Sequence, residues 1–255
     1  MFLLDGVSFQ PENKHILHPT SLAIAKGKVT TLLGHNGSGK STLLKLLSRK
    51  IAPTQGNILL TNTALDQFSA KEFAFRVGYL PQHPPITEGV TVYELVQFGR
   101  YPWKGVLGRY NDDDHRIVGE AISDVGLTSM SERFVSTLSG GERQRAWVAM
   151  LLAQQSECIL LDEPTSALDV AHQYELLSLI RNLNTSRGIT VIMVLHDINM
   201  AARFSDTLIA LHSGRVLAQG SPDDLMTEAT LASIYGIPLG KFQHPQSGHT
   251  ITYVL

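Results

Sequence analysis

Apolar runs and helical periodicities alternate along the chain, and this pattern predicts an α/β protein. Nearly continuous apolar runs at residues 29–33, 158–161 and 189–195 are typical of parallel strands that are buried on both faces. Helical patterns at residues 40–48 and 171–184 follow two of these runs. We therefore expect strands and helices to succeed one another in a parallel-sheet core.

The remaining pattern adds two regions to this core. Short strands with turn signals between them are predicted in the first quarter of the chain, at residues 2–9, 20–25 and 57–61. The stretch from residue 83 to about 137 is helical in character, with helices expected at 91–98 and 113–125 and loops at 101–105 and 109–112. We interpret this stretch as a helical insertion, which a helix over 141–154 follows.

The later part of the chain completes the predicted core. A strand is expected at residues 77–80, a helix at 198–204, and a hairpin formed by 207–211 and 215–218. Two short helices are expected near residues 222–226 and 228–235. The pattern of the last 20 residues predicts no definite element.

Composition excludes several classes of protein. The 255 residues carry 21 basic and 23 acidic side chains, a formal charge of −2, which argues against a nucleic-acid partner. No apolar run reaches about 18 residues, so no transmembrane helix is expected. The first six residues, with an acid at position 5, are not expected to form a signal peptide. A single cysteine rules out an internal disulfide and fits a reducing cytoplasm.

A glycine-rich turn between a strand and a helix is the strongest candidate site. It matches the phosphate-loop pattern Gly-x-x-x-x-Gly-Lys-Ser/Thr, in which backbone N–H groups at a helix N-terminus converge on a phosphate. Lys40 can reach the β- and γ-phosphates of a nucleotide, and the Ser41 hydroxyl can ligate Mg²⁺. The predicted ATP-binding residues of the loop are Gly34, His35, Asn36, Gly37, Ser38, Gly39, Lys40, Ser41 and Thr42.

Two adjacent carboxylates end a buried strand at residues 158–161. Ligands of parallel sheets bind beyond the carboxyl ends of the strands. Asp162 is therefore a candidate Mg²⁺ ligand beside Ser41, and Glu163 is the candidate general base that activates water. An ordinary acidic turn before Pro164 is the alternative interpretation.

A third motif precedes the helix at residues 141–154. Ser139 and Glu142 have the spacing of a capping box, which alone predicts a well-capped helix. Gly140 and Gly141 in the first turn weaken that helix by about 1 kcal/mol each, which capping does not explain. Because glycines expose backbone N–H groups, we expect this helix start to bind a second phosphate.

With this third motif, the chain resembles the ATP-binding-cassette ATPases. Residues 138–144 are similar to the signature motif of that family, and the order of motifs along the whole chain matches as well. The resemblance implies one domain over residues 1–255, a P-loop NTPase (RecA-like) core with an N-terminal antiparallel β-subdomain. The core is expected at about 1–82 and 155–255, and the helical subdomain at about 83–154.

The resemblance also implies that two copies face each other and hold ATP between them. One copy then contributes its phosphate loop, and the other contributes the signature in trans. The residues implied to act in trans are Ser139, Gly140, Gly141 and Asp169.

Further roles follow from the same resemblance. Gln82, after a strand, is implied to sense Mg²⁺ and the attacking water, and to couple to a membrane partner. His196, which ends another strand, is implied to contact the γ-phosphate. Phe9 is implied to stack on adenine, although a core position is an alternative for this side chain.

Segments outside these motifs resemble one group within the family. Residues 98–103, 196–203 and 234–238 are similar to the ATPase subunits of bacterial iron–siderophore importers, and residues 17–19 and 34–40 are most similar to the ferrichrome type. The resemblance implies integral-membrane permease subunits as partners at the cytoplasmic face of the inner membrane. It also implies, indirectly, a periplasmic or lipid-anchored siderophore-binding protein.

Several alternatives stay open. Vitamin B12 and haem importers share the implied architecture, and a non-transport ATPase such as an iron–sulfur assembly factor has a similar size. A phosphate-loop kinase is disfavoured by residues 138–144. The loop at Tyr101-Pro102-Trp103 is expected to line a groove for the permease, with packing of Trp103 inside its own subdomain as the alternative.

Overall fold

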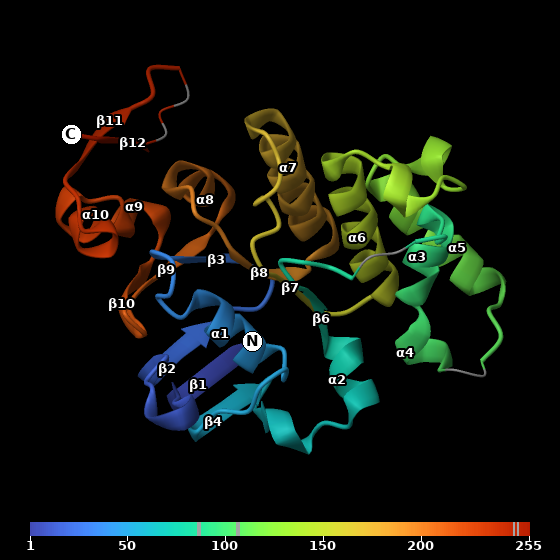
Figure 1. Cartoon of the computed structure of the whole chain (residues 1–255), viewed down its shortest axis with the longest axis horizontal. Coiled ribbons are helices and arrows are strands. Elements are labelled where there is room, and N and C mark those ends of the chain that lie inside the picture. Colours follow the sequence, from blue (N-terminus) through green and yellow to red (C-terminus); the bar gives the residue numbers. More distant parts are fainter. Residues whose placement is uncertain (86–87, 106–107, 247, 249) are drawn as a thin grey trace. The chain divides into compact units, whose positions relative to one another are not determined.

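The computed structural model describes residues 1–85, 88–105, 108–246, 248 and 250–255 (Figure 1). The chain forms two compact units. The first comprises Met1–Phe68 and Arg181–Leu255, and the second comprises Ser69–Ile180. The predicted division into a core and a helical subdomain stays a prediction.

The first unit contains an antiparallel sheet in its N-terminal part. Its strands are ordered β2-β1-β4-β5. Apolar side chains on one face of β1 and β2, such as Phe2, Leu4 and Leu17, are buried, whereas Leu3 of β1 is exposed. The bounds of the strands are β1 Phe2–Phe9, β2 Leu17–Ile24, β4 Gln55–Leu60 and β5 Thr63–Ala64. The β2 strand therefore begins before the predicted residue 20.

A second set of strands in this unit is mainly parallel. β3 (Val29–Leu33) lies between β8 (Thr190–Val194) and β9 (Thr207–His212), and it is parallel to both. β10 (Arg215–Gly220) pairs with β9 in antiparallel orientation. All residues of β3 and β8 are buried, as their nearly continuous apolar pattern predicts.

Helices of the first unit follow the predicted positions closely. α1 (Lys40–Leu47) leaves the phosphate loop, and α8 (Ile198–Phe204) follows β8. α9 (Pro222–Leu225) and α10 (Glu228–Tyr235) come near the end of the chain. A C-terminal hairpin of β11 (Leu239–Gln243) and β12 (Thr250–Val254) was not predicted. Short 3-10 turns occur at Pro11–Asn13 and Leu65–Gln67.

The second unit combines helices with two parallel strands. β6 (Val77–Leu80) pairs in parallel with β7 (Cys158–Leu161), and the sole cysteine, Cys158, is fully buried at the start of β7. Its helices are α2 Ala70–Arg76, α3 Val92–Phe98, α4 Tyr101–Lys104, α5 Asp112–Asp124, α6 Gly140–Gln154 and the greater part of α7 Val170–Arg187, with 3-10 turns at Thr128–Met130 and Val135–Thr137.

One predicted loop of this unit is wrong. Residues 101–104 form the short helix α4 rather than a loop, because Pro102 stands in its first turn, where proline needs no N–H partner. α3, α5 and α6 pack on one another through buried side chains such as Leu95, Val118 and Val148. The mixture of parallel and antiparallel sheets with helices confirms the predicted α/β class.

Candidate functional site

The phosphate loop joins β3 to α1 in the first unit. Gly34 has a φ of +141°, and a side chain at this position would place its Cβ 2.1 Å from the carbonyl oxygen of Leu211. Only glycine fits there. Gly39 has a φ of +101° and lies in the left-handed region at the N-cap of α1. The loop is thus a tight cradle between a strand end and a helix start.

Lys40 occupies the centre of this cradle. The side chain is almost completely buried, and its Nζ donates hydrogen bonds to the carbonyl oxygens of Gly34 at 2.8 Å and His35 at 3.0 Å. The first backbone bond of α1 runs from Leu43 N–H to the oxygen of Gly39. The N–H groups that begin a helix have no partner within it and attract anions. The residues present therefore fit a nucleotide triphosphate.

His196 lies at the same sheet edge of this unit. Leu32, next to the last residue of β3, pairs with Val194 at the end of β8, and Leu195 N–H donates to the oxygen of Leu32 at 3.3 Å. β3 then enters Gly34, whereas β8 is followed by exposed His196 and the N-cap residue Asp197. The parallel register therefore brings His196 to the strand ends from which the phosphate loop begins.

Phe9 ends β1 close to the same loop. The carbonyl oxygen of Phe9 accepts from Ile16 N–H at 3.0 Å, and the carbonyl of Ile16 faces Gly39, 3.1 Å from a Cβ built there. Two histidines for which no role was predicted lie in this segment. The rings of His15 and His18 stack at 4.9 Å with an angle of 8° between their planes. Nothing in the local sequence pattern around these two histidines indicates that their rings stack.

The carboxylate pair lies in the second unit, after β7. Asp162 is buried, and its backbone N–H donates to Leu80 O at 3.0 Å. The hydroxyl of Tyr79 donates to Asp162 Oδ2 at 3.5 Å. Burial, and then the charge of Asp162, raise the pKa of Tyr79 to about 12. This phenol therefore stays protonated and serves as a donor to the carboxylate at neutral pH.

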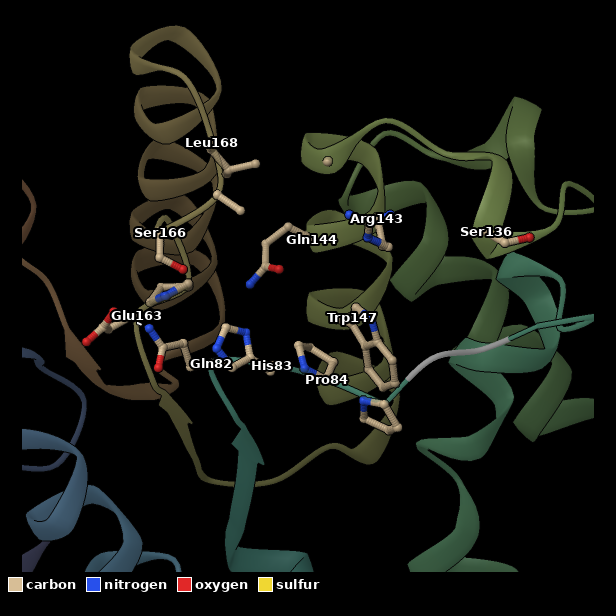
Figure 2. A pocket seen from close by; sticks show the side chains of 14 residues that line it. Gln82, His83, Pro84, Ser136, Arg143, Gln144, Trp147, Glu163, Ser166 and Leu168 are labelled. Atoms are coloured by element: carbon tan, nitrogen blue, oxygen red, sulfur yellow. Dashed lines mark hydrogen bonds between the residues drawn. The ribbon is translucent and has the colours of Figure 1, made fainter.

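Glu163 and Gln82 meet at the ends of the two strands of this unit. Gln82 Nε2 donates to Glu163 Oε2 at 2.6 Å, as Figure 2 shows from close by. Glu163 has a φ of +51°, in the left-handed region that residues other than glycine rarely adopt. Backbone strain of this kind clusters at functional sites. The sequence thus predicted two candidates separately, and the structure brings their side chains together.

The signature segment begins α6 with a complete capping box. Glu142 N–H donates to Ser139 Oγ at 3.3 Å, and Ser139 N–H donates to Glu142 Oε2 at 2.8 Å. Hydrogen bonds to the Glu142 carboxylate, from the backbone and then from the side chain of Ser139, lower the pKa of Glu142. The capping that the sequence predicted is therefore confirmed.

Packing explains Gly141 in a way that the sequence did not reveal. A Cβ on this residue would lie 2.8 Å from Cδ2 of His172, in the first turn of α7. Asp169 Oδ1 accepts from the backbone N–H of His172 at 2.9 Å and lies 2.8 Å from its Nδ1. His172 thus connects the signature glycine to Asp169, two positions predicted to act in trans.

A cavity of about 370 Å³ adjoins these residues within the second unit. Gln82 and Glu163 lie at one side of it, whereas Arg143, Gln144 and Trp147 reach into it from α6 (Figure 2). The other lining residues are His83, Pro84, Pro85, Ser136, Gly140, Pro164, Ser166, Ala167 and Leu168. The cavity therefore joins the candidate base to the signature helix.

Trp103 follows the alternative prediction for its segment. Its Nε1 donates to Gln154 O at 2.9 Å, its ring lies 4.3 Å from that of Phe75, and the Arg100 guanidinium lies 5.0 Å from its ring centroid. It does not line the cavity described above. Trp103 thus makes its contacts within its own unit, and both its side chain, at 42%, and that of Tyr101 beside it, at 55%, are exposed.

Two absences apply to the described part of the chain. Among those residues, no helix is both long and apolar enough to span a membrane. The same residues contain no cluster of three or more His, Cys, Asp or Glu side chains that could hold a metal ion. The predicted Mg²⁺ ligands include a serine and a glutamine, so they do not depend on such a cluster.

Comparison with protein families identifies the chain. The family described as ABC transporter matches residues 17–166. The chain belongs to the ABC transporter family. It is an ATP-binding ATPase coupled to transmembrane transport, and its cofactor is ATP.

Individual relatives cover most of the chain. The iron(3+)-hydroxamate import ATP-binding protein FhuC of Bacillus subtilis is 46% identical over 87% of this chain and 82% of its own length. The ferric enterobactin transport ATP-binding protein FepC of Escherichia coli is 42% identical over 89% and 84%. The hemin import ATP-binding protein HmuV of Photobacterium damsela subsp. piscicida is 37% identical over 96% and 93%.

Solved structures agree with this family. An inward-facing putative metal-chelate type ABC transporter has a TM-score of 0.87 and 27% identity, and covers 100% of this chain and 97% of its own. A dimeric bacterial ABC transporter cassette has a TM-score of 0.76 and 27% identity, over 87% of this chain and 99% of its own. The P-loop NTPase fold predicted from the sequence is confirmed.

Proposed function

We propose that this chain hydrolyses ATP to energise import of an iron–siderophore complex, with a ferric hydroxamate as the first candidate cargo. Relatives named for hydroxamate, petrobactin and enterobactin transport support the siderophore class. The highest identity among these three, 46%, belongs to the hydroxamate relative. Haem is the second candidate, because a hemin import protein aligns over 96% of this chain.

The contact between Gln82 and Glu163 supports this function most directly. The 2.6 Å hydrogen bond from Gln82 holds one carboxylate oxygen of Glu163 beside the end of β7. The backbone of Glu163 has a positive φ of +51°, which is strained for this residue type. A carboxylate held in this way can orient water and accept its proton, which contributes about 10²–10⁴-fold to a rate. Gln82 fixes the carboxylate, and we assign it the sensing of that water.

The remaining roles in the nucleotide site follow from chemistry. Lys40 and the loop amides offset negative charge on the β- and γ-phosphates, and His196 contacts the γ-phosphate. We propose Ser41, Asp162 and Gln82 as the residues that hold Mg²⁺. When bound, Mg²⁺ supplies further positive charge to the phosphates. Phe9 is assigned to the adenine.

We further propose that a second copy of the chain completes the site. Ser139, Gly140, Gly141 and Asp169 then act on the nucleotide of the partner copy. The dimeric cassette with 27% identity supports this arrangement. The exposed carboxylate of Asp169, which caps α7, and the contact between Gly141 and His172 keep the trans residues together on one surface of the second unit.

The cavity beside Gln82 is the proposed docking site of a permease. Pro84, Pro85 and Trp147 give it an apolar wall, and Arg143 adds positive charge. A short amphipathic helix of a membrane partner suits such a groove. One structural relative is part of the ABC transporter complex cbiONQ. We place the chain at the cytoplasmic face of the membrane, with a siderophore-binding protein acting indirectly.

Reconstitution tests this proposal. The chain is co-purified with its permease, inserted into vesicles, and supplied with ATP outside and a binding protein loaded with ferric hydroxamate inside. We expect ATP-dependent movement of the ferric hydroxamate out of the vesicle lumen. The lumen corresponds to the outside of the cell, so this movement corresponds to import. The matched control is Glu163→Gln, which should bind ATP and transport nothing.

The cargo series decides between the candidates. Ferric enterobactin, haem and vitamin B12 are supplied in the same vesicles with their own binding proteins. Transport of haem alone would move the assignment to the second candidate. A complex that hydrolyses no ATP with any of these cargoes would contradict the proposed function.

A further inference from the structure

The C-terminal segment, residues 221–255, has no role in the site described so far. It comprises α9, α10 and the hairpin β11–β12, at the red end of the chain in Figure 1. All of it belongs to the first unit, and β12 contacts α8 in the same unit. Since α8 follows His196 directly, the hairpin packs on the helix that begins beside a proposed γ-phosphate contact.

One side chain joins α8 to β12 through three hydrogen bonds. Asn199 Nδ2 donates to Thr252 O at 3.1 Å, and Asn199 Oδ1 accepts from Thr252 N–H at 2.8 Å and from its hydroxyl at 3.1 Å. Thr252 is 6% exposed. The asparagine amide thus pairs with both backbone groups of Thr252 as a neighbouring strand would. We call these contacts the Asn199–Thr252 clamp.

The geometry of the hairpin explains why the clamp forms at Thr252. In an antiparallel pair, alternate residues direct both backbone groups away from the partner strand. Thr252, which lies opposite Lys241 of β11, is such a residue: its N–H and carbonyl bond to the side chain of Asn199 instead of to β11. Without the amide, these two buried groups would lose their partner, which is costly. The clamp therefore requires both the amide group of Asn199 and the outward-facing backbone groups of Thr252.

The clamp acts close to His196 along the chain. Asp197 is the N-cap of α8 and accepts from Met200 N–H at 2.9 Å, and Asn199 lies in the first turn of that helix. On the other side of His196, Leu195 is bonded to Leu32 of β3. His196 therefore lies between the end of β8, which is bonded to β3, and the start of α8, which the Asn199–Thr252 clamp fixes to β12.

The same segment makes a second approach to the site. Tyr235, at the end of α10, is close enough to Asp197 that burial, and then the Asp197 charge, raise its pKa to about 12. Its buried hydroxyl makes no hydrogen bond among the described residues. Ile234 O lies 3.4 Å from His212 Nδ1, and the His212 ring stands 4.5 Å from the ring of His35 in the phosphate loop.

We propose that Asn199 is a positioning residue, which uses the C-terminal hairpin to hold His196 in place for ATP hydrolysis. This inference rests on the proposed function of His196. The hairpin is then a part of the hydrolytic machinery rather than an appended tail. Loss of the clamp lowers the rate of hydrolysis more than the affinity for ATP, because the phosphate loop keeps its own contacts.

A double-mutant cycle tests this coupling. The full chain, co-purified with its permease, is prepared as wild type, Asn199→Ala, His196→Ala and the double variant, and kcat, KM and the affinity for a non-hydrolysable ATP analogue are measured. We expect Asn199→Ala to lower kcat by about tenfold, since three hydrogen bonds of modest net strength are lost. The affinity should change by less than about twofold.

The double variant decides how the clamp acts. If Asn199 works through His196, then Asn199→Ala should add little to the loss that His196→Ala already causes. Another tenfold loss in the double variant would overturn the proposal. So would an unchanged kcat in Asn199→Ala, or an equal fall of kcat and affinity. If His196→Ala is fully active, the assigned role of His196 fails, and the inference fails with it.

Matched variants separate positioning from stability. Thr252→Ser keeps all three hydrogen bonds and should match wild type, whereas Thr252→Val loses the hydroxyl contact alone and should lie between wild type and Asn199→Ala. Tyr235→Phe removes a hydroxyl that makes no hydrogen bond among the described residues, and Gln219→Ala removes a single exposed amide contact, to Ala23 O on another strand. Both controls should retain kcat. A loss in Gln219→Ala equal to that in Asn199→Ala would attribute the effect to general stability.

Discussion

Asp114 in the second unit offers a prediction with a calculable magnitude. Its carboxylate is 2% exposed and accepts from Arg100 Nε at 3.0 Å, Lys104 Nζ at 2.6 Å and Asn111 N–H at 3.0 Å. Arg100 is also buried, and its NH1 group donates to Ala153 O at 3.0 Å and Gln155 Oε1 at 2.9 Å. These bonds tie the segment that carries α4 to α5 and to the end of α6.

The structure gives the sign of the pH dependence. Burial would raise the pKa of Asp114, but hydrogen bonds from Lys104, Asn111 and Arg100 outweigh it and lower the pKa from 3.8 to about 2. Because the folded pKa lies below the unfolded one, the ionised carboxylate stabilises the fold above pH ~4. This stability, about 2 kcal/mol, is lost as the pH falls towards ~2.

Truncating the Asp114 side chain has a larger effect than protonating its carboxylate. Asp114→Ala leaves the Arg100 guanidinium buried without its anion, which costs about 3–5 kcal/mol. Asp114→Asn keeps the shape of the side chain and should cost about 2 kcal/mol at neutral pH. In wild type, protonation of Asp114 lowers the free energy of unfolding between pH ~4 and ~2. Asp114→Asn should lack this part of the pH dependence.

Urea unfolding at pH 7 and pH 3 measures these quantities, with tryptophan fluorescence as the probe. Both tryptophans, Trp103 and Trp147, lie in the second unit with Asp114, and the Trp103 ring lies 5.0 Å from the Arg100 guanidinium. Asp113→Ala is the matched control, since Asp113 is exposed on the same helix and its pair with Arg116 lies at the surface. Its free energy of unfolding should stay close to that of wild type. An Asp114→Ala variant within about 1 kcal/mol of wild type at pH 7 would refute the reasoning.

The remaining predictions concern the nucleotide site. Glu163→Gln should keep ATP affinity and lower kcat by about 10²–10⁴-fold in a phosphate-release assay, and undiminished turnover would remove Glu163 from the role of base. Lys40→Ala should weaken ATP affinity by roughly 10- to 100-fold in a titration with labelled nucleotide, and unchanged affinity would contradict its assignment. Gly141→Ala should lower stability by about 1–3 kcal/mol, because its Cβ meets the His172 ring at 2.8 Å, and His172→Ala should relieve this loss in the double variant.

Local cues explain the elements that the sequence predicted well. β1, β3, β6 and β7 have the predicted bounds. β3, β6 and β7 are short, mainly apolar runs next to turn signals, whereas β1 contains both buried apolar and exposed positions. α8 and α10 begin after Asp197 and Thr227, whose side chains cap them as such residue types suggest. The boundaries that shifted, such as the start of β2, lie where strand pairing continues past the local pattern.

Long-range contacts explain what the sequence did not reveal. The Asn199–Thr252 clamp joins residues that are 53 positions apart, and nothing in either local pattern indicates the pairing. The same holds for the approach of His172 to Gly141, which makes a glycine necessary for packing as well as for exposure of its N–H. Both contacts depend on tertiary structure, which periodicity and capping rules do not encode.

The candidate site was predicted in its parts rather than as an assembly. The family resemblance identified Gln82, and the position after a buried strand identified Glu163, but their hydrogen bond depends on the parallel pairing of β6 with β7. The strained φ of Glu163 likewise has no signature in residue type. Sequence order therefore predicts which residues take part, and strand register determines which of them touch.

The burial of Cys158 has a practical consequence for spectroscopy. Thiols react as thiolates, and burial raises the pKa of this fully enclosed thiol. In the folded protein, Cys158 should therefore not react with maleimide dyes or nitroxide spin labels, so it need not be replaced before labelling. A cysteine introduced at exposed Phe134 would then be the one labelled position in an otherwise unaltered molecule.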